Sequence, residues 1–171
     1  MIKVYIDMAN LMSECRVKNI IIDMNSFYVW INDVYKATDV TIFTGYLSKY
    51  ASEYRLNKKI GYTYIFKEAV FNKDESKIKA NCDVDIAIEG AIDCVENYLD
   101  MAVLISSDGD FLSLIKFWQS RNIKVRLISP ADPNKCSYLL KRINIPTTYL
   151  SQVVEKFIYT NEKALDEDET S

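Results

Sequence analysis

Residues 101–110 of the chain read MAVLISSDGD, an apolar run of strand length followed by two serines and by two aspartates on either side of a glycine. A second apolar run that ends in an acid stands at the start of the chain, where residues 2–7 read IKVYID. Short apolar runs bounded by turn residues are typical of buried strands. Because ligands of open α/β sheets bind outside the carboxyl ends of the strands, we expect Asp7, Asp108 and Asp110 to border a binding site.

Segments with strand and helix patterns alternate along the whole chain. Strands are expected at residues 2–6, 39–46, 62–66, 101–105, 123–128 and 145–149, and helices at 24–36, 48–61, 83–98, 108–120, from 134 and at 151–158. In the helix over 83–98, one face carries Val84, Ile88, Ala91, Ile92 and Val95. This alternation predicts an α/β protein with a mostly parallel central sheet and helices on both faces.

The chain of 171 residues is long enough for one domain with a substantial core. Its composition changes only near the C-terminus, so we expect a single domain over residues 1–160 and an acidic, disordered tail over residues 161–171. Residues 161–170 hold five acids against Lys163. Without them 20 basic and 19 acidic residues remain, so the net charge of −3 becomes +1. Such acidic segments are typical of solvated tails.

Composition also excludes several classes of protein. The longest apolar stretches are far shorter than the roughly 20 residues of a membrane-spanning helix. Since the first residues run directly into a strand, we expect a cytoplasmic protein without a signal peptide. The four cysteines form no CxxC pair, and we expect them to be buried free thiols. The chain has no histidine, which leaves carboxylates, lysine, tyrosine or a metal-bound hydroxide as general base.

The acids near Gly109 indicate a cation site. Gly109 lets the backbone turn tightly, and two carboxylates beside each other repel unless a cation neutralises them. A further candidate is Asp83, at the expected start of a helix, where the helix dipole favours an anion. Divalent cations such as Mg²⁺ prefer oxygen ligands, so a carboxylate cluster without histidine suits them. For Asp7 taken alone, a turn or helix cap is the better interpretation, and for Asp83 a helix cap is a good alternative.

Polar and basic residues near these acids are candidates for contacts with a phosphate. Asn10 follows Asp7 by three residues and is expected to orient a water or a phosphate, while Ser106 and Ser107 are expected to bind the carboxylates or a phosphate. Lys79, upstream of Asp83, is expected to bridge a phosphate to the acidic site.

Residues 49–79 combine eight basic with four acidic residues, interleaved with aromatic ones. Basic groups neutralise phosphates and aromatic rings stack on unpaired bases, so this segment, including Lys58 and Lys59, is a candidate substrate platform. The alternative interpretation, a solvated helix face beside core aromatics, is about equally good for any single residue.

Three motifs in this order resemble the NYN domain of the LabA-like group, in the PIN-like nuclease superfamily. They are residues 6–11 (IDMANL), Lys79 with residues 83–89 (DVDIAIE), and residues 106–111 (SSDGDF), and the similarity spans about residues 1–150. The resemblance implies a Rossmann-like PIN-type domain with an acidic pocket that holds Mg²⁺ or Mn²⁺. By motif, the implied metal-binding and catalytic residues are Asp7, Asp83, Asp108 and Asp110, with Asn10 in a supporting role. The chain departs from the family pattern at Glu89, often aspartate, and at Ser107, more commonly glycine.

The combined hypothesis is a metal-dependent nuclease, an endoribonuclease on single-stranded RNA, because single strands expose their bases to stacking side chains. The first alternative is a non-catalytic RNA-binding or regulatory module that retains the acidic pocket. A small-molecule phosphatase is a more distant alternative, since the chain lacks a GxxxxGK[ST] loop and a GxGxxG turn. The expected partner is nucleic acid rather than a membrane, and the sequence leaves the oligomeric state open.

Overall fold

A computed structural model describes residues 1–67, 70–71, 78–79 and 81–158 of the chain, so the predicted tail lies outside the described residues. Its centre is a six-stranded sheet in the order β3-β2-β1-β6-β7-β8, in which all neighbours are parallel. The strands are β1 (Ile2–Asp7), β2 (Asp39–Gly45), β3 (Thr63–Lys67), β6 (Met101–Ile105), β7 (Lys124–Ser129) and β8 (Thr147–Tyr149). The predicted α/β class is therefore confirmed.

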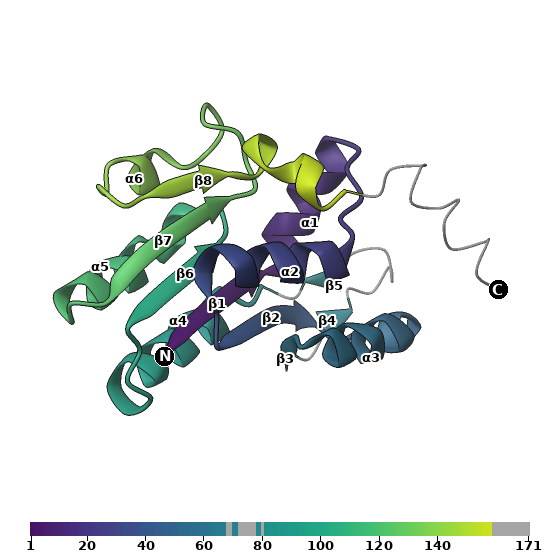
Figure 1. Ribbon diagram of the computed structural model, residues 1–171, viewed down its shortest axis with the longest axis horizontal. Helices are drawn as coiled ribbons and strands as arrows, with labels where there is room; N and C mark the ends of the chain where they lie inside the picture. Colours follow the sequence, from purple (N-terminus) through teal and green to yellow (C-terminus); the bar gives the residue numbers. More distant parts are fainter. Residues whose placement is uncertain (68–69, 72–77, 80, 159–171) are drawn as a thin grey trace.

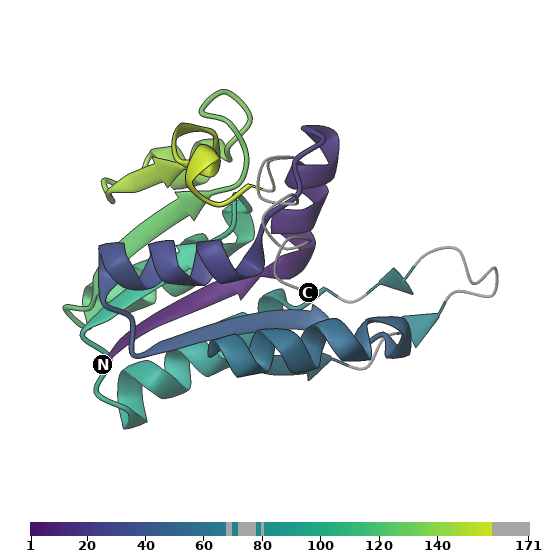
Figure 2. The same ribbon diagram turned by 45° about the vertical axis from the view of Figure 1, so that its right-hand side comes forward.

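Helices cover both faces of this sheet (Figure 1). The helices α1 (Met8–Val17), α2 (Met24–Tyr35) and α3 (Ala51–Ile60) lie on one face, and α4 (Asp83–Glu96) and α5 (Leu112–Ser120) lie on the other. The remaining helical elements are single turns: η1 (Ser48–Tyr50), η2 (Gly109–Phe111), α6 (Tyr138–Lys141), η3 (Leu150–Gln152) and η4 (Val154–Lys156). Two further strands, β4 (Val70–Phe71) and β5 (Ile78–Lys79), form an antiparallel pair. Figure 2 shows this pair beyond the end of β3.

The central strands are apolar because both of their faces are buried. In β1, Val4 and Ile6 point into the core beneath α1 and α2, whereas Tyr5 points into the core beneath α4 and α5. Each of these side chains is fully buried. The alternation follows from the two-residue period of a strand, and it fixes the direction in which Asp7 leaves the sheet.

The strand order reverses between β1 and β6. From β1 the chain builds outward through β2 and β3, and from β6 it builds outward in the other direction through β7 and β8. At such a reversal the flanking connections leave on opposite faces and open a crevice at the carboxyl edge. Asp7 ends β1, and Asp108 follows β6 by three residues, so both acids stand at this point.

The observed helices depart from the expected ones at three places. Helix α1 was not expected, because only Leu11 and Cys15 of its ten residues are buried and its apolar pattern is weak. The helix expected from residue 134 is a single turn over Tyr138–Lys141. The helix expected at 151–158 is replaced by the 3-10 turns η3 and η4.

The apolar face of α4 points away from the core, opposite to the usual orientation of an amphipathic helix. Val84, Ile88 and Val95 are all more than half exposed, whereas Ile86, Gly90 and Asp93 are buried. Two contacts explain this orientation.

The first contact is steric. Gly90 lies so close to α5 that an added Cβ would stand 2.5 Å from Trp118 Cζ2, and Trp118 Nε1 donates a hydrogen bond to the Gly90 carbonyl at 2.8 Å. A larger residue would push α4 away from α5. The glycine therefore determines which face of α4 packs inward.

The second contact is a buried ion pair. Lys3 Nζ lies 2.8 Å from Asp93 and 2.8 Å from Glu89, and the Tyr5 hydroxyl donates to Asp93 at 2.8 Å. Burial lowers the pKa of Lys3, but the hydrogen bonds to Asp93 and Glu89 and the charges of Asp93 and Asp39 outweigh it, so the pKa is raised. These bonds join α4 to β1. They also pair Glu89 with Lys3, near the start of β1 and away from the carboxyl edge of the sheet.

The structure also bears on the cysteines and on the length of the apolar helices. None of the four cysteines forms a disulfide; Cys15, Cys82 and Cys136 are buried as expected, whereas Cys94 is half-buried. Among the described residues, no helix is both long and apolar enough to cross a membrane.

Candidate metal centre

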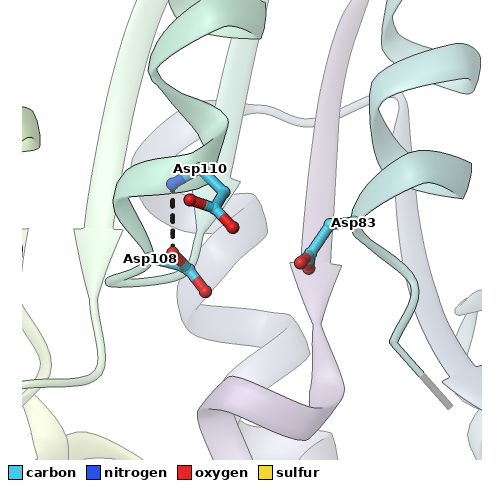
Figure 3. Close-up of side chains that lie close together, drawn as sticks. All are labelled: Asp83, Asp108 and Asp110. Atoms are coloured by element: carbon cyan, nitrogen blue, oxygen red, sulfur yellow. Dashed lines mark hydrogen bonds between the residues drawn. The ribbon is translucent and has the colours of Figure 1, made fainter.

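Three aspartates meet at the reversal point of the sheet (Figure 3). Asp83 is the first residue of α4, Asp108 precedes η2 as its N-cap, and Asp110 lies in η2. Each offers a carboxylate oxygen, and these three oxygens lie within 4.8 Å of one another. Asp83 and Asp108 are half-buried and Asp110 is exposed, so the cluster is open to solvent on one side.

Local hydrogen bonds fix the positions of these carboxylates. Asp108 Oδ1 accepts from the Asp110 N–H at 3.0 Å, the dashed line in Figure 3, which folds the two acids onto one side of the turn. The Asp83 N–H donates to Asn81 Oδ1 at 2.8 Å at the start of α4. The start of α4 therefore fixes the backbone of Asp83 at the end of the helix dipole that favours an anion.

Gly109 is needed for space rather than for an unusual backbone conformation. Its φ is not among the positive values of the chain, and a Cβ at this position would collide with the Ser137 side chain. The Ser137 N–H in turn donates to the Ser107 carbonyl at 3.3 Å. The loop before α6 thus packs directly on the acidic turn, which gives Gly109 a packing role in addition to its place in the 3-10 turn η2.

The acidic cluster carries uncompensated charge. Burial raises the pKa of Asp83, and the charges of Asp108 and Asp110 raise it further, while the bond from Asn81 and the charge of Lys67 oppose the shift. Lys67 Nζ bonds the Asn81 carbonyl at 2.8 Å and Asp85 at 3.1 Å. Its place at the end of β3 explains why a lysine that is distant in sequence reaches the start of α4.

Asp7 is more deeply buried than the three clustered carboxylates and is not one of them. It is 5% exposed, its Oδ1 accepts from the Asn10 N–H at 3.1 Å, and its Oδ2 accepts from Ser106 Oγ at 3.1 Å. Burial raises the pKa of Asp7, the two hydrogen bonds lower it, and the charges of Asp83 and Asp108 raise it again. Asp7 therefore interacts electrostatically with Asp83 and Asp108, while its own oxygens accept hydrogen bonds from Asn10 and Ser106.

Asn10, Ser106 and Ser107 connect Asp7 to the acidic turn. Asn10 Oδ1 accepts from the Ser107 N–H at 3.0 Å and from Ser107 Oγ at 2.8 Å. Ser106 Oγ accepts from the Asp108 N–H at 3.2 Å while it donates to Asp7. Both serines are buried, so in this structure they position the turn. Contact with a substrate phosphate stays a prediction for these three residues.

Two of the three candidate lysines are neighbours on one helix, and the third lies on another element. Lys58 and Lys59 are exposed on α3. Lys58 lines a cavity at the ends of β2 and β3, and Lys59 is absent from that lining. For Lys79 the structure describes the backbone, in β5 opposite Val70.

The donor set fits a hard divalent cation. It consists of carboxylate oxygens alone, with no nitrogen or sulfur ligand, which suits Mg²⁺ or Mn²⁺. The three carboxylates lie close enough together to share one such cation. A cation there would also relieve the mutual repulsion that raises the pKa of Asp83.

Comparison with known proteins identifies a family for the chain. Among solved structures, a protein of unknown function from Vibrio parahaemolyticus RIMD 2210633 superposes with a TM-score of 0.75 at 20% sequence identity, over 92% of this chain and 95% of that chain, a likeness that shows the fold alone. No match was found among the curated proteins. The family model of the NYN domain matches residues 1–144. Since this match covers most of the chain, the protein belongs to the NYN domain family.

Proposed function

We propose that this protein is a metal-dependent endoribonuclease of the LabA-like, PIN-like type that hydrolyses phosphodiester bonds in single-stranded RNA. The observation that carries the proposal is the group of three carboxylates within 4.8 Å at the reversal point of a parallel sheet. Membership of the NYN domain family supports a nuclease of the PIN-like type. The all-oxygen donor set and the absence of histidine favour metal-assisted hydrolysis over a side-chain nucleophile.

Asp83, Asp108 and Asp110 would hold Mg²⁺ or Mn²⁺, and the buried Asp7 would be the fourth acid of the site. When bound, such a cation supplies positive charge to the scissile phosphate and lowers the pKa of a bound water. The buried carboxylate of Asp7 and the bonds of Ser106 hold the turn that carries Asp108 in place. Asn10 fixes the same turn through Ser107, so the acidic oxygens are preorganised before substrate arrives.

Substrate would enter across the open side of the cluster, next to Asp110. Lys67, which stands beside the start of α4, is well placed to neutralise a neighbouring phosphate. Lys58, Lys59 and Lys79 are proposed to hold more distant phosphates of the same strand.

Cleavage of end-labelled single-stranded RNA and DNA in Mn²⁺, Mg²⁺ or EDTA tests the proposal. The wild type is expected to cut RNA only with metal, and Asp108→Asn is expected to lose at least a hundredfold in rate while staying folded, because asparagine caps helices about as well as aspartate.

Asp23→Asn is a matched control. Asp23 is the N-cap of α2, and its Oδ1 accepts from the Asn25 N–H at 3.0 Å, the same local bond that Asp108 makes with Asp110. This variant should cut at the wild-type rate. Equal cutting by wild type and Asp108→Asn would refute the site. A folded wild type that binds RNA without cutting it would instead favour the non-catalytic binding module.

A further inference from the structure

We propose that the cavity between α3 and the ends of β2 and β3 binds one unpaired nucleobase together with its phosphate. This inference rests on the proposed function, because it assigns part of the same single-stranded substrate to a second place on the protein. The cavity has a volume of about 290 Å³. Its lining, called here the aromatic cavity, consists of Tyr46, Ala51, Tyr54, Arg55, Lys58 and Phe66.

Three aromatic rings form the wall of this cavity. The ring centroid of Tyr46 lies 5.8 Å from that of Tyr54 and 5.3 Å from that of Phe66, and the centroids of Tyr54 and Phe66 are 4.9 Å apart. Tyr46 is nevertheless 46% exposed, so part of its ring is free to contact a ligand. Flat aromatic surface that remains in water beside other rings is a good stacking site for a base.

The wall is held in place before any ligand binds. Tyr64 stacks on Phe66 with an interplanar angle of 15° and also contacts Tyr54, and its hydroxyl accepts from Asn57 Nδ2 at 2.8 Å. The backbone N–H of Tyr46 donates to the Lys67 carbonyl at 3.1 Å. Rings fixed in this way lose little conformational freedom on binding, which favours affinity.

The charge of the lining selects an anionic aromatic ligand. Arg55 and Lys58 lie one turn apart on α3, and Lys58 Nζ stands 5.6 Å from the centroid of the Phe66 ring. Both residues that carry charge in the lining are basic. A quaternary ammonium would be attracted by the rings but repelled by these cations, whereas a nucleotide offers a base to the rings and a phosphate to the cations.

The aromatic cavity lies on the same edge of the sheet as the acidic cluster. Asp7 is paired in register with Phe43, and Phe43 with Ile65, so Phe66 is one residue beyond the level of Asp7. Two strand spacings separate β1 from β3, a distance of about 10 Å. Lys67 follows Phe66 and bonds the start of the helix that carries Asp83. A single strand cut at the acidic cluster would therefore reach the aromatic cavity with a nearby base.

Binding measured without metal tests this inference separately from cleavage. Fluorescence anisotropy in EDTA would compare a labelled single-stranded RNA with the duplex of the same sequence. Tyr46→Ala is expected to weaken single-strand binding about 5- to 150-fold, the effect of losing one base–aromatic stack. Tyr46→Phe keeps the ring and should stay within about twofold of the wild type. Duplex binding should not change, since paired bases cannot reach the rings.

Tyr98→Ala is the matched control for a lost exposed ring. Tyr98 is 89% exposed and lies between α4 and β6, at the edge of the sheet opposite to the carboxyl ends of the strands. This variant should bind RNA as the wild type does. Thermal melting of each variant checks folding, and Tyr46→Ala is expected to fold because its ring is exposed.

The outcomes separate the two proposals. If Tyr46→Ala binds single strands as tightly as the wild type, or the wild type does not bind them, the aromatic cavity is not a base site, whatever the cleavage assay shows. If Tyr46→Ala loses binding while the wild type never cuts RNA, the cavity assignment holds and the nuclease proposal fails.

Discussion

The carboxylates of Asp83, Asp108 and Asp110 repel one another, and burial together with this repulsion raises the pKa of Asp83. Clustered charge of this kind destabilises the metal-free protein and becomes favourable when a cation binds. Such a trade of stability for function is common at active sites. It makes a prediction about stability that does not depend on any substrate.

We predict that Asp83→Asn raises the melting temperature of the metal-free protein, because the neutral amide removes one of three clustered charges. Added Mn²⁺ should raise the melting temperature of the wild type more than that of the variant. Calorimetry in EDTA and in Mn²⁺ measures both effects.

Asp85→Asn serves as the control in the same turn of α4. Asp85 forms an ion pair with Lys67 at 3.1 Å, so its amide should not raise the melting temperature. A lower melting temperature for Asp83→Asn than for the wild type in EDTA would show that the cluster is not under repulsion.

Sequence reasoning identified the acids at this edge of the sheet but not how its polar neighbours are used. Asp108 and Asp110 were placed correctly at the carboxyl edge, because position after a strand is visible in sequence. The partner of a hydrogen bond is not visible in sequence, so Ser106 and Ser107 were expected to bind either the carboxylates or a phosphate. In the structure Ser106 donates to Asp7, whereas Ser107 donates to Asn10. Lys67 was counted only as one of eight basic residues, since its nearness to α4 depends on the sheet order.

At the scale of elements, α4 is the clearest departure from periodicity. Its regular apolar stripe is exposed, and its buried face contains an isoleucine, a glycine and an aspartate. The spacing of apolar residues does not reveal a buried ion pair or a close contact between helices. In α4 both of these favour burial of the face opposite to the apolar stripe. The same limit explains α1, whose two buried side chains were too few to give a pattern.

A pair of substitutions tests this orientation. We predict that Ile86→Ala costs about 2 to 5 kcal/mol in the free energy of unfolding, because Ile86 is fully buried. Ile88→Ala, two residues on and 56% exposed, should cost less than about 1 kcal/mol. Urea unfolding of both variants measures the two losses in free energy of unfolding. A larger loss for Ile88→Ala than for Ile86→Ala would mean that α4 packs with its apolar stripe inward.

The buried ion pair of Lys3 makes a prediction with a defined pH range. Lys3→Met should cost about 3 to 5 kcal/mol at neutral pH, because Asp93 would stay buried without its cation. Since the pKa of Lys3 is raised in the folded protein, its contribution is complete below pH 10.5 and is lost as the pH rises through the folded value.

Urea unfolding at pH 7, 9 and 11 would follow this loss. The difference between wild type and Lys3→Met should be equal at pH 7 and 9 and smaller at pH 11. Lys124→Met, at the exposed start of β7, is a control that should change little at any pH. A difference that grows with pH would contradict the assigned ion pair.

At the scale of the whole molecule, alternation of strands and helices was enough to predict the fold class. It also placed the acids correctly, because parallel strands put all of their carboxyl ends at one edge. The strand order could not be read from the alternation, and it is the order that sets Asp7 and Asp108 at the reversal point. Pairing across β1, β2 and β3 likewise brings the aromatic cavity and the acidic cluster to one edge.

Calorimetric titration of the protein with Mn²⁺ tests the central claim, that the clustered carboxylates hold a divalent cation. The account predicts saturable binding to the wild type and to Asp23→Asn, and at least a tenfold weaker affinity for Asp108→Asn, which removes one of three charged ligands. Equal Mn²⁺ affinity of wild type and Asp108→Asn, with both proteins folded, would contradict it.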